Sequence, residues 1–328
     1  MFIVPYQILL RIYFPGFYRY IWRMPELPEV HTTVTGLNRV LRNKKILDVW
    51  SNYNSAFHKN KPNIKNVHYF TDFKKKVFGA TFLKAERRGK NILIHLSNGS
   101  TILIHMKMTG HLLYGKYRYV PKEKIWCAEE AGPLQDPYNQ HIRLVFNLSN
   151  KKHLAFSDLR KFGKVFVFPT KELHALQDLS TLGPEPLEKN FTLEQFEERI
   201  LRRPRAPIKS VLMDQKIIAG IGNIYSDEML WASSIHPLSR STCIPKAFVK
   251  LLFKEMKIVL ANGISFGGDS DSDYRNIDGD IGEFQNKHHA YRHTGEICFK
   301  KSCGGIITRL VIGGRSAHFC PKHQKIFT

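Results

Sequence analysis

The spacing of apolar residues changes along the chain from a helical period to short β-type runs. Val30, Val34, Leu37 and Leu41 recur at helical intervals and predict a helix over residues 29–41. Runs of β-forming residues bounded by turn residues follow, at 46–50, 77–83, 91–96, 101–106, 142–148 and 165–168. This block predicts a β-sandwich or barrel with one N-terminal helix.

A second, helical block follows a segment rich in proline and glycine. Residues 181–186 (TLGPEP) indicate a domain boundary, and helical spacing returns over 192–201, 208–214, 224–233 and 246–262. A Gly/Asp-rich loop covers 263–282, and two β runs, 306–312 and 315–319, joined by Gly313-Gly314, predict a hairpin. We therefore predict domains over residues 25–180 and 181–290 and a C-terminal finger over 291–328.

The first residues differ in composition from the rest of the chain. Residues 1–23 contain eight aromatic side chains, three Arg and no acid, and Pro5, Pro15 and Gly16 interrupt any period. We interpret residues 1–24 as an extension that is removed or not translated, with a second start at Met24. A mitochondrial presequence is the alternative.

The charge balance indicates a polyanionic partner. The chain has 50 Lys+Arg against 28 Asp+Glu, a net charge of +22, while 43% of its residues are hydrophobic. A folded protein with such a surplus of cations favours nucleic acid as a partner ahead of an acidic membrane surface. No apolar run reaches the ~18 residues that a membrane span requires, which argues against a transmembrane protein.

Clustered cysteines near the C-terminus predict a metal site. Cys298-x4-Cys303 and Cys320-x2-His323 supply three thiolates and one imidazole, a donor set that tetrahedral zinc accepts. We predict one structural Zn²⁺ on these four residues, with a zinc-free hairpin as the alternative. The remaining cysteines, at positions 127 and 243, have no partner at metal-binding spacing and are interpreted as structural.

The segment MPELPEV, which starts at Met24, contains a candidate nucleophile. If translation starts at Met24 and this residue is trimmed, Pro25 becomes a free secondary amine that can form an iminium with an aldehyde-level carbon. Glu26 could act as general acid/base if burial raises its pKa. The alternative is that the prolines only start the helix, with Glu29 favourable in its first turn.

Several motifs in the same order resemble the Fpg/Nei DNA glycosylases, and among them the formamidopyrimidine-DNA glycosylase branch. They are MPELPEV, RRGKNILIHL (87–96), IHMKMTG (104–110), DLRKFG (158–163), LGPEPL (182–187), the run at 208–237, the loop at 267–285 and GGRSAHFCPKHQ (313–324). The resemblance implies an α+β multidomain fold. It consists of a two-layer β-sandwich with flanking helices, a helix–two-turn–helix domain and a zinc-finger β-hairpin.

The resemblance also implies a function in base excision repair. It predicts a bifunctional DNA glycosylase/AP lyase that excises oxidised purines (8-oxoguanine, formamidopyrimidines) through a Pro25 Schiff base and β,δ-elimination. Glu26 would protonate the sugar ring oxygen, and Glu29 would support or orient it. The partner would be double-stranded DNA with oxidised or abasic sites, bound by a monomer. The compartment would be one that contains DNA: a nucleus, a bacterial or viral cytoplasm, or a mitochondrion.

The resemblance further assigns residues to DNA contacts. Met108, Arg160 and Phe162 would fill the hole left by a nucleotide flipped out of the duplex. Without the family context, Met108 and Phe162 would instead be interpreted as core residues. The 267–284 loop would close over a flipped oxidised purine, or else be simply mobile.

Four polar residues would contact the DNA backbone. Lys90 would bind the phosphate beside the lesion, with a solvated turn charge as the alternative. Asn223 opens a predicted helix and would bind phosphate, although Asn is also an ordinary helix cap. Lys209 would be a further contact, and Arg315, at the hairpin tip, would enter the DNA.

Two other functions remain open from the sequence. An endonuclease VIII-like enzyme would keep the mechanism but prefer oxidised pyrimidines. A non-catalytic binder of damaged DNA would result if the Pro25 nitrogen stays acylated, because an amide nitrogen cannot form the Schiff base.

Overall fold

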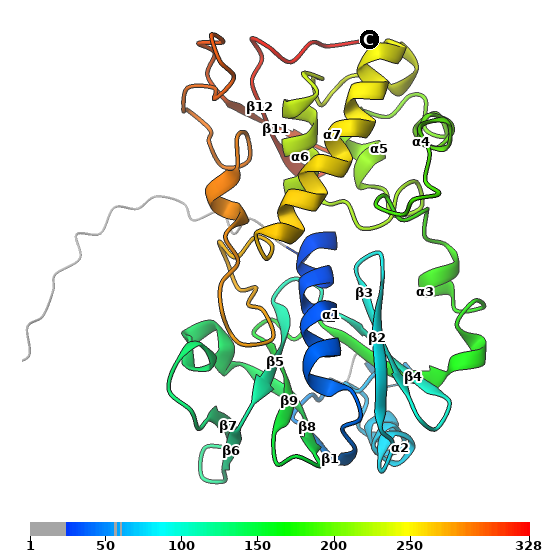
Figure 1. The fold of residues 1–328 in the computed structure, drawn as a ribbon, viewed down its shortest axis with the longest axis vertical. Helices are drawn as coiled ribbons and strands as arrows, with labels where there is room; N and C mark the ends of the chain where they lie inside the picture. Colours follow the sequence, from blue (N-terminus) through cyan, green and yellow to red (C-terminus); the bar gives the residue numbers. More distant parts are fainter. Residues whose placement is uncertain (1–23, 56–57, 60) are drawn as a thin grey trace, which may run out of the picture.

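The computed structural model describes residues 24–55, 58–59 and 61–328. Of the predicted extension, only Met24 lies among the described residues. Figure 1 shows a lower part made mainly of strands and an upper part made mainly of helices; α1 runs along the strands of the lower part, and its upper end reaches the helical part.

Helix α1 (Leu27–Leu41) begins two residues before the predicted start. Its N-cap is Glu26, which forms a capping box with Glu29: each side chain accepts a hydrogen bond from the backbone of the other. Pro28 occupies the first turn, where its missing N–H is not required. The same two carboxylates therefore start the helix and stand next to Pro25.

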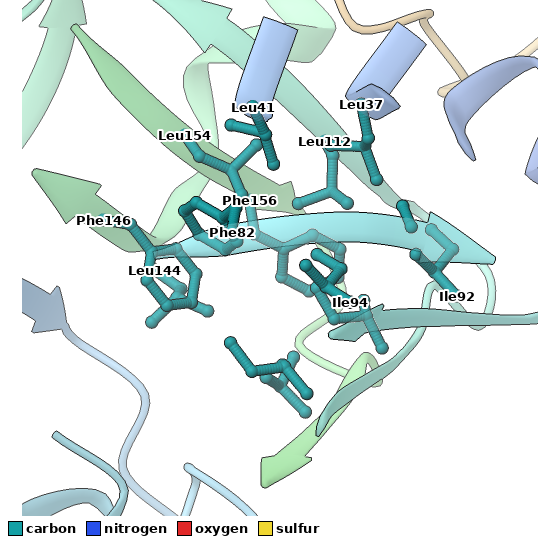
Figure 2. Close-up of a cluster of buried hydrophobic side chains, with 14 of the residues drawn as sticks. Leu37, Leu41, Phe82, Ile92, Ile94, Leu112, Leu144, Phe146, Leu154 and Phe156 are labelled. Carbon is teal, nitrogen blue, oxygen red and sulfur yellow. The ribbon is translucent and has the colours of Figure 1, made fainter. Parts of the chain in front are cut away.

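Two antiparallel sheets form the N-terminal sandwich. One has the strand order β1 (Ile46–Ser51), β8 (Ile142–Leu148), β9 (His153–Asp158) and β5 (Gly110–Gly115). The other has the order β10 (Lys164–Pro169), β4 (Ser100–His105), β3 (Asn91–Leu96) and β2 (Phe82–Arg88). Side chains from both sheets and from α1 fill the core, as Figure 2 shows for Leu37, Leu41, Phe82, Ile92, Ile94, Leu112, Leu144, Phe146, Leu154 and Phe156.

The strand predicted over 77–83 is wrong for most of its length. Helix α2 (Val67–Val77) ends there, and β2 starts only at Phe82. The Asn66 side chain caps α2, and Phe73 and Val77 face the core at helical spacing. A run of Val and Phe is compatible with either a helix or a strand. The residue that favours the helix, the N-cap Asn66, lies outside the run.

A small hairpin forms a separate two-stranded sheet that packs against the first sheet. It consists of β6 (Tyr117–Val120) and β7 (Ile125–Ala128) and is followed by the 3₁₀ helices η2 (Pro133–Gln135) and η3 (Pro137–Gln140). Trp126 of the hairpin packs against Trp50 of β1. Sequence reasoning did not predict this hairpin.

The helical part has its own hydrophobic core. Its helices are α3 (Gln177–Ser180), α4 (Leu193–Ile200), α5 (Ile208–Met213), α6 (Asn223–Ala232) and α7 (Lys246–Ser265), with the 3₁₀ segments η4 (Thr170–Glu172), η5 (Ser241–Cys243) and η6 (Phe284–Lys287). Strands β11 (Thr308–Ile312) and β12 (Arg315–Phe319) form the C-terminal hairpin. The expected fold class is therefore confirmed. Within the described residues, no helix has the length and apolarity needed to span a membrane.

The two parts meet at the start of α1. The backbone N–H of Leu27 donates to the Gly220 carbonyl (3.0 Å), and the Leu27 side chain packs in the core of the helical part. At the linker, the Glu185 carboxylate accepts hydrogen bonds from Arg87, Arg88 and the Gly89 N–H. These contacts place the first turn of α1 at the interface.

Candidate active site and DNA-binding surface

The Glu26 carboxylate is buried at the junction of the two parts. Its Oε1 accepts a hydrogen bond from the Ile224 N–H (2.9 Å) in the first turn of α6. Gly222 lies so close that an added Cβ would stand 2.3 Å from the carboxyl carbon, so any larger residue there would displace the Glu26 carboxylate. The other oxygen, Oε2, has no hydrogen-bond partner within the described part of the chain. Glu26 is therefore fixed by one oxygen, and the other is available for chemistry.

Glu29 is held by three donors from three segments. Its Oε2 accepts the Glu26 N–H (2.7 Å), and its Oε1 accepts the Tyr225 hydroxyl (2.6 Å) and the Asp269 N–H (2.7 Å). Burial, followed by the charge of Glu26, raises the pKa of Glu29 to about 7. This carboxyl group can therefore exchange protons near neutral pH.

Burial also raises the pKa of Glu26, opposed mainly by the positive charge of Lys90. Lys90 itself is half-buried. Its pKa is lowered by desolvation, while the negative charges of Glu26 and Glu29 act in the opposite direction. The interpretation of Lys90 as a solvated turn charge therefore does not hold.

A cavity of about 680 Å³ opens in front of these residues. Its lining includes Glu26, Lys90, His105, Asn223 and Arg315. The cavity brings a carboxyl group of raised pKa, Glu26, together with several cations and an amide, which suits a substrate that carries phosphate and requires proton transfer.

Asn223 and Arg315 reach the cavity from different elements. Asn223 is the first residue of α6, whose N-cap is Gly222, so the side chain of Asn223 does not cap the helix. Its Nδ2 donates to the Ser316 hydroxyl (3.4 Å), and its buried Oδ1 has no partner in the described part of the chain. Arg315 begins β12 and is exposed at the turn of the hairpin.

Contrary to expectation, Lys209 does not lie at this surface. Its ammonium group is buried and forms an ion pair with Asp227 (2.6 Å), with further hydrogen bonds to the Asn223 carbonyl and the Ser226 hydroxyl. The other oxygen of Asp227 accepts hydrogen bonds from His318 on β12. Lys209 therefore joins α5 to α6 and, through Asp227, to the hairpin.

Met108, Arg160 and Phe162 form one cluster on two neighbouring loops. The Arg160 guanidinium lies 4.9 Å from the centre of the Phe162 ring, and its Nη1 is 3.7 Å from the Met108 sulfur. The Phe162 side chain is 46% exposed. Phe162 is therefore not a core residue, and the cluster presents an exposed aromatic ring at the surface.

Asp158 connects the two loops of this cluster, and sequence reasoning did not single it out. Its carboxylate accepts hydrogen bonds from the Thr109 hydroxyl (2.6 Å), the Tyr53 hydroxyl (2.6 Å) and the Gly163 N–H (2.7 Å). The Arg160 N–H then donates to Thr109 Oγ1 (3.0 Å). The sequence signal that could have found Asp158 is its position as the first residue of the motif DLRKFG. Tyr225 and Asp269 were also missed.

The predicted metal ligands converge. One donor atom from each of Cys298, Cys303, Cys320 and His323 lies within 4.8 Å of the others. The Cys303 and Cys320 sulfurs are 3.6 Å apart, close to the roughly 3.8 Å that two Zn–S bonds at a tetrahedral angle impose. Nε2 of His323 is 3.1 Å from the Trp231 carbonyl, which leaves Nδ1 facing the thiols. The cluster can therefore hold a metal ion.

Comparison with known proteins agrees with this geometry. Residues 24–165 match the family model of the formamidopyrimidine-DNA glycosylase N-terminal domain, and residues 182–274 match that of its H2TH domain. A formamidopyrimidine-DNA glycosylase from Pelotomaculum thermopropionicum is 36% identical over 303 residues, covering 92% of this chain and 100% of the relative. The Bacillus subtilis enzyme of the same name is 34% identical, covering 92% and 99%.

Solved structures give the same result. A complex of a Lactococcus lactis FPG mutant with DNA containing Fapy-dG has a TM-score of 0.76 and 28% identity, covering 92% of this chain and 100% of that one. A complex of the Lactococcus lactis enzyme with DNA containing an abasic site has a TM-score of 0.75. The chain therefore belongs to the formamidopyrimidine-DNA glycosylase family of base excision repair.

Proposed function

We propose that this protein is a bifunctional DNA glycosylase/AP lyase that removes oxidised purines from duplex DNA. The observation that carries the proposal is the buried pair of Glu26 and Glu29 beside Pro25, with one oxygen of Glu26 left without a partner in the described chain. The solved relative bound to Fapy-dG DNA supports the choice of substrate.

In the proposed reaction, the Pro25 nitrogen attacks C1′ of the flipped nucleotide. The bond between C1′ and the base breaks, and its electron pair leaves with the base. Glu26 delivers a proton to the sugar ring oxygen, so that the ring opens and an iminium forms between Pro25 and C1′. Because the iminium accepts electrons, loss of a C2′ proton then expels the 3′ phosphate, and a second elimination releases the 5′ phosphate.

The proposal requires an unacylated nitrogen at position 25. Met24 precedes it, and a Met24–Pro25 amide would delocalise the lone pair of this nitrogen. The active form would therefore begin at Pro25, with Met24 and the residues before it removed or never made.

The remaining surface residues would bind the DNA. Met108, Arg160 and Phe162 would enter the duplex where the nucleotide has left, because unstacking costs a few kcal/mol and a stacked ring recovers part of it. Lys90, Asn223 and Arg315 would hold the phosphates next to the extruded nucleotide. Lys209 is not among these contacts in the proposal, since its charge is already neutralised by Asp227.

Zn²⁺ is the ion that we propose for the Cys298, Cys303, Cys320 and His323 cluster. Three thiolates and an imidazole in tetrahedral spacing are a structural zinc donor set. The ion would hold the finger to α6, whose Trp231 contacts two of the ligands.

Borohydride trapping on 8-oxoguanine duplexes tests the proposal. Reduction of the iminium should leave a covalent adduct that maps by mass spectrometry to Pro25. Protein acetylated at its N-terminus is the control, and it should give none. An adduct that persists after acetylation, or that maps to another residue, would show that Pro25 is not the nucleophile. Faster trapping on thymine glycol than on 8-oxoguanine duplexes would favour an oxidised-pyrimidine substrate.

A further inference from the structure

The 267–285 loop crosses from the helical part to the sandwich. In Figure 1 it descends from the end of α7, beside α1, towards β5. Between α7 and η6 it has no helix or strand of its own. Its position therefore depends on the contacts that it makes, because a loop of this length is mobile unless it is packed or bonded.

The lower end of the loop is inserted into the sandwich domain. Tyr274 and Ile277 are 4% and 2% exposed and belong to the sandwich core. Ile277 packs so closely on α1 that a Cβ at Gly36 would be 2.4 Å from its side chain. The Ile277 carbonyl also accepts the Tyr114 N–H of β5 (2.7 Å).

A charged contact holds the same end of the loop. The Arg275 side chain is 6% exposed, and its Nε and Nη2 donate to Asp136 Oδ2 at 3.2 and 3.1 Å. Its Nη1 donates to the loop's own carbonyls at Ser272 and Tyr274 (both 2.8 Å). The guanidinium also lies 4.8 Å from the centre of the Tyr138 ring. The Arg275 guanidinium thus binds the loop to the segment that contains η2 and η3.

The upper end of the loop contacts Glu29. The Asp269 N–H donates to Glu29 Oε1 (2.7 Å), and a Cβ at Gly268 would meet the Glu29 side chain at 2.9 Å. The Tyr274 hydroxyl donates to the Glu29 backbone carbonyl (2.9 Å). The position of the loop therefore determines how Glu29 is held.

We propose that Asp136 and Arg275 form a latch that keeps the 267–285 loop in place before DNA arrives, and that the latched loop fixes Glu29 for base excision. This inference rests on the function proposed above. Asp136 and Arg275 are positioning residues, which act through the loop on Glu29.

The latch should matter more for base excision than for strand cleavage at a preformed abasic site. Base excision as proposed above requires Glu26 to deliver a proton to the sugar ring oxygen, and Glu29 accepts the backbone N–H of Glu26. An abasic site has already lost its base, and its ring-opened aldehyde reacts readily with an amine. The two substrates therefore separate the effect on the carboxyl groups from any general effect on DNA binding.

The experiment compares the wild-type protein with Asp136→Asn, Arg275→Gln and Arg275→Lys. Asp136→Asn removes the charge but keeps the oxygen that accepts the Tyr138 N–H. The control is Lys116→Gln, which removes an exposed ion pair with Glu130 at the base of the same segment. Hydrogen exchange of residues 271–281 without DNA, single-turnover excision of 8-oxoguanine and incision of abasic duplexes are measured.

Asp136→Asn and Arg275→Gln should speed exchange in the loop and slow excision about tenfold, with abasic incision within about twofold of wild type. Arg275→Lys, which retains the charge, should recover part of the excision rate, and Lys116→Gln should change nothing. Unchanged exchange in the loop, or an equal loss on both substrates, would overturn the inference. If the wild-type protein itself cleaves neither substrate, the proposed function fails, while the exchange measurement still decides whether the latch holds the loop.

Discussion

At the scale of single residues, the chemistry is concentrated in the first turn of α1. The motif MPELPEV was sufficient to single out Pro25, Glu26 and Glu29, because a proline amine next to acids is chemically unusual. It could not show that Glu29 is held by Tyr225 and Asp269, since both lie about 200 residues or more further along the chain. The pKa values of Glu26 and Glu29 are raised mainly because the folded chain buries both carboxyl groups, and the sequence alone does not show this burial.

Glu29 should make the stability of the protein depend on pH. Its pKa is raised from 4.5 to about 7, so the folded state retains a proton that the unfolded chain has lost between these values. Stability from this group is complete below pH 4.5 and declines as the pH rises to about 7. Urea unfolding measures this effect. From pH 5 to pH 8 the free energy of unfolding of the wild-type protein should fall by on the order of 3 kcal/mol more than that of Glu29→Gln. Parallel curves for the two proteins would contradict the assignment.

Glu26→Gln should separate binding from chemistry. The amide oxygen can still accept the Ile224 N–H, but the side chain can no longer transfer a proton. Single-turnover base excision should fall by about 100-fold or more, while affinity for lesion DNA stays near that of wild type. Glu130→Gln, an exposed carboxylate, is the matched control. Excision at the wild-type rate would mean that Glu26 serves only as the helix cap.

At the scale of elements, sequence reasoning predicted the helices α1, α4, α5, α6 and α7 and most of the sandwich strands, but it missed helix α2 and strands β5 and β9. It assigned a strand where Phe and Val occur at the end of a helix, as at Val77 and Phe78. A short apolar run does not distinguish the helical period from the alternation of a strand. It also could not decide whether Phe162 was buried. The exposure of that ring depends on Asp158, which holds its loop to Thr109 from a neighbouring strand connection.

Phe162→Ala should impair function without destabilising the fold. The ring is 46% exposed, so its loss should change the free energy of unfolding by no more than about 0.5 kcal/mol. Excision from duplex DNA should nevertheless slow markedly, because a stacked ring contributes about 1–3 kcal/mol per base. Phe78→Ala, at a 62% exposed ring, controls for the loss of surface area. Equal excision rates for Phe162→Ala and Phe78→Ala would show that Phe162 does not stack in the duplex during excision.

At the scale of the whole molecule, the finger and α6 bring Arg315 to the cavity. Asp227 links Lys209 to His318, and Asn223 contacts Ser316, so β12 is positioned by buried polar contacts as well as by the cysteine cluster. The spacing of the cysteines predicted the ligand set. No sequence pattern indicated that Lys209 would form an internal ion pair, because a buried lysine and a surface lysine look alike in sequence.

Removal of the metal should weaken DNA binding through Arg315. His323→Ala, or prolonged chelation, should release the finger and reduce affinity by about as much as Arg315→Ala, roughly 1–3 kcal/mol. Fluorescence anisotropy over a salt series measures this loss, and elemental analysis of the untreated protein should find one zinc per chain. Cys243→Ser, at an exposed cysteine outside the cluster, is the control. Full affinity after chelation, or no zinc, would contradict the proposed role.

The insertion of Leu27 into the helical core has a consequence for how the molecule can be divided. A fragment that stops at residue 180 would keep Pro25, Glu26 and Glu29. It would lose the Gly220 carbonyl, which accepts the Leu27 N–H, and the Ile224 N–H, which donates to Glu26. In such a fragment the first turn of α1 would lose these contacts with the helical part. Adding residues 181–328 as a second chain should restore catalysis only when the two chains associate. The proposed nucleophile therefore lies at the interface of the two parts, and its placement depends on contacts from both of them.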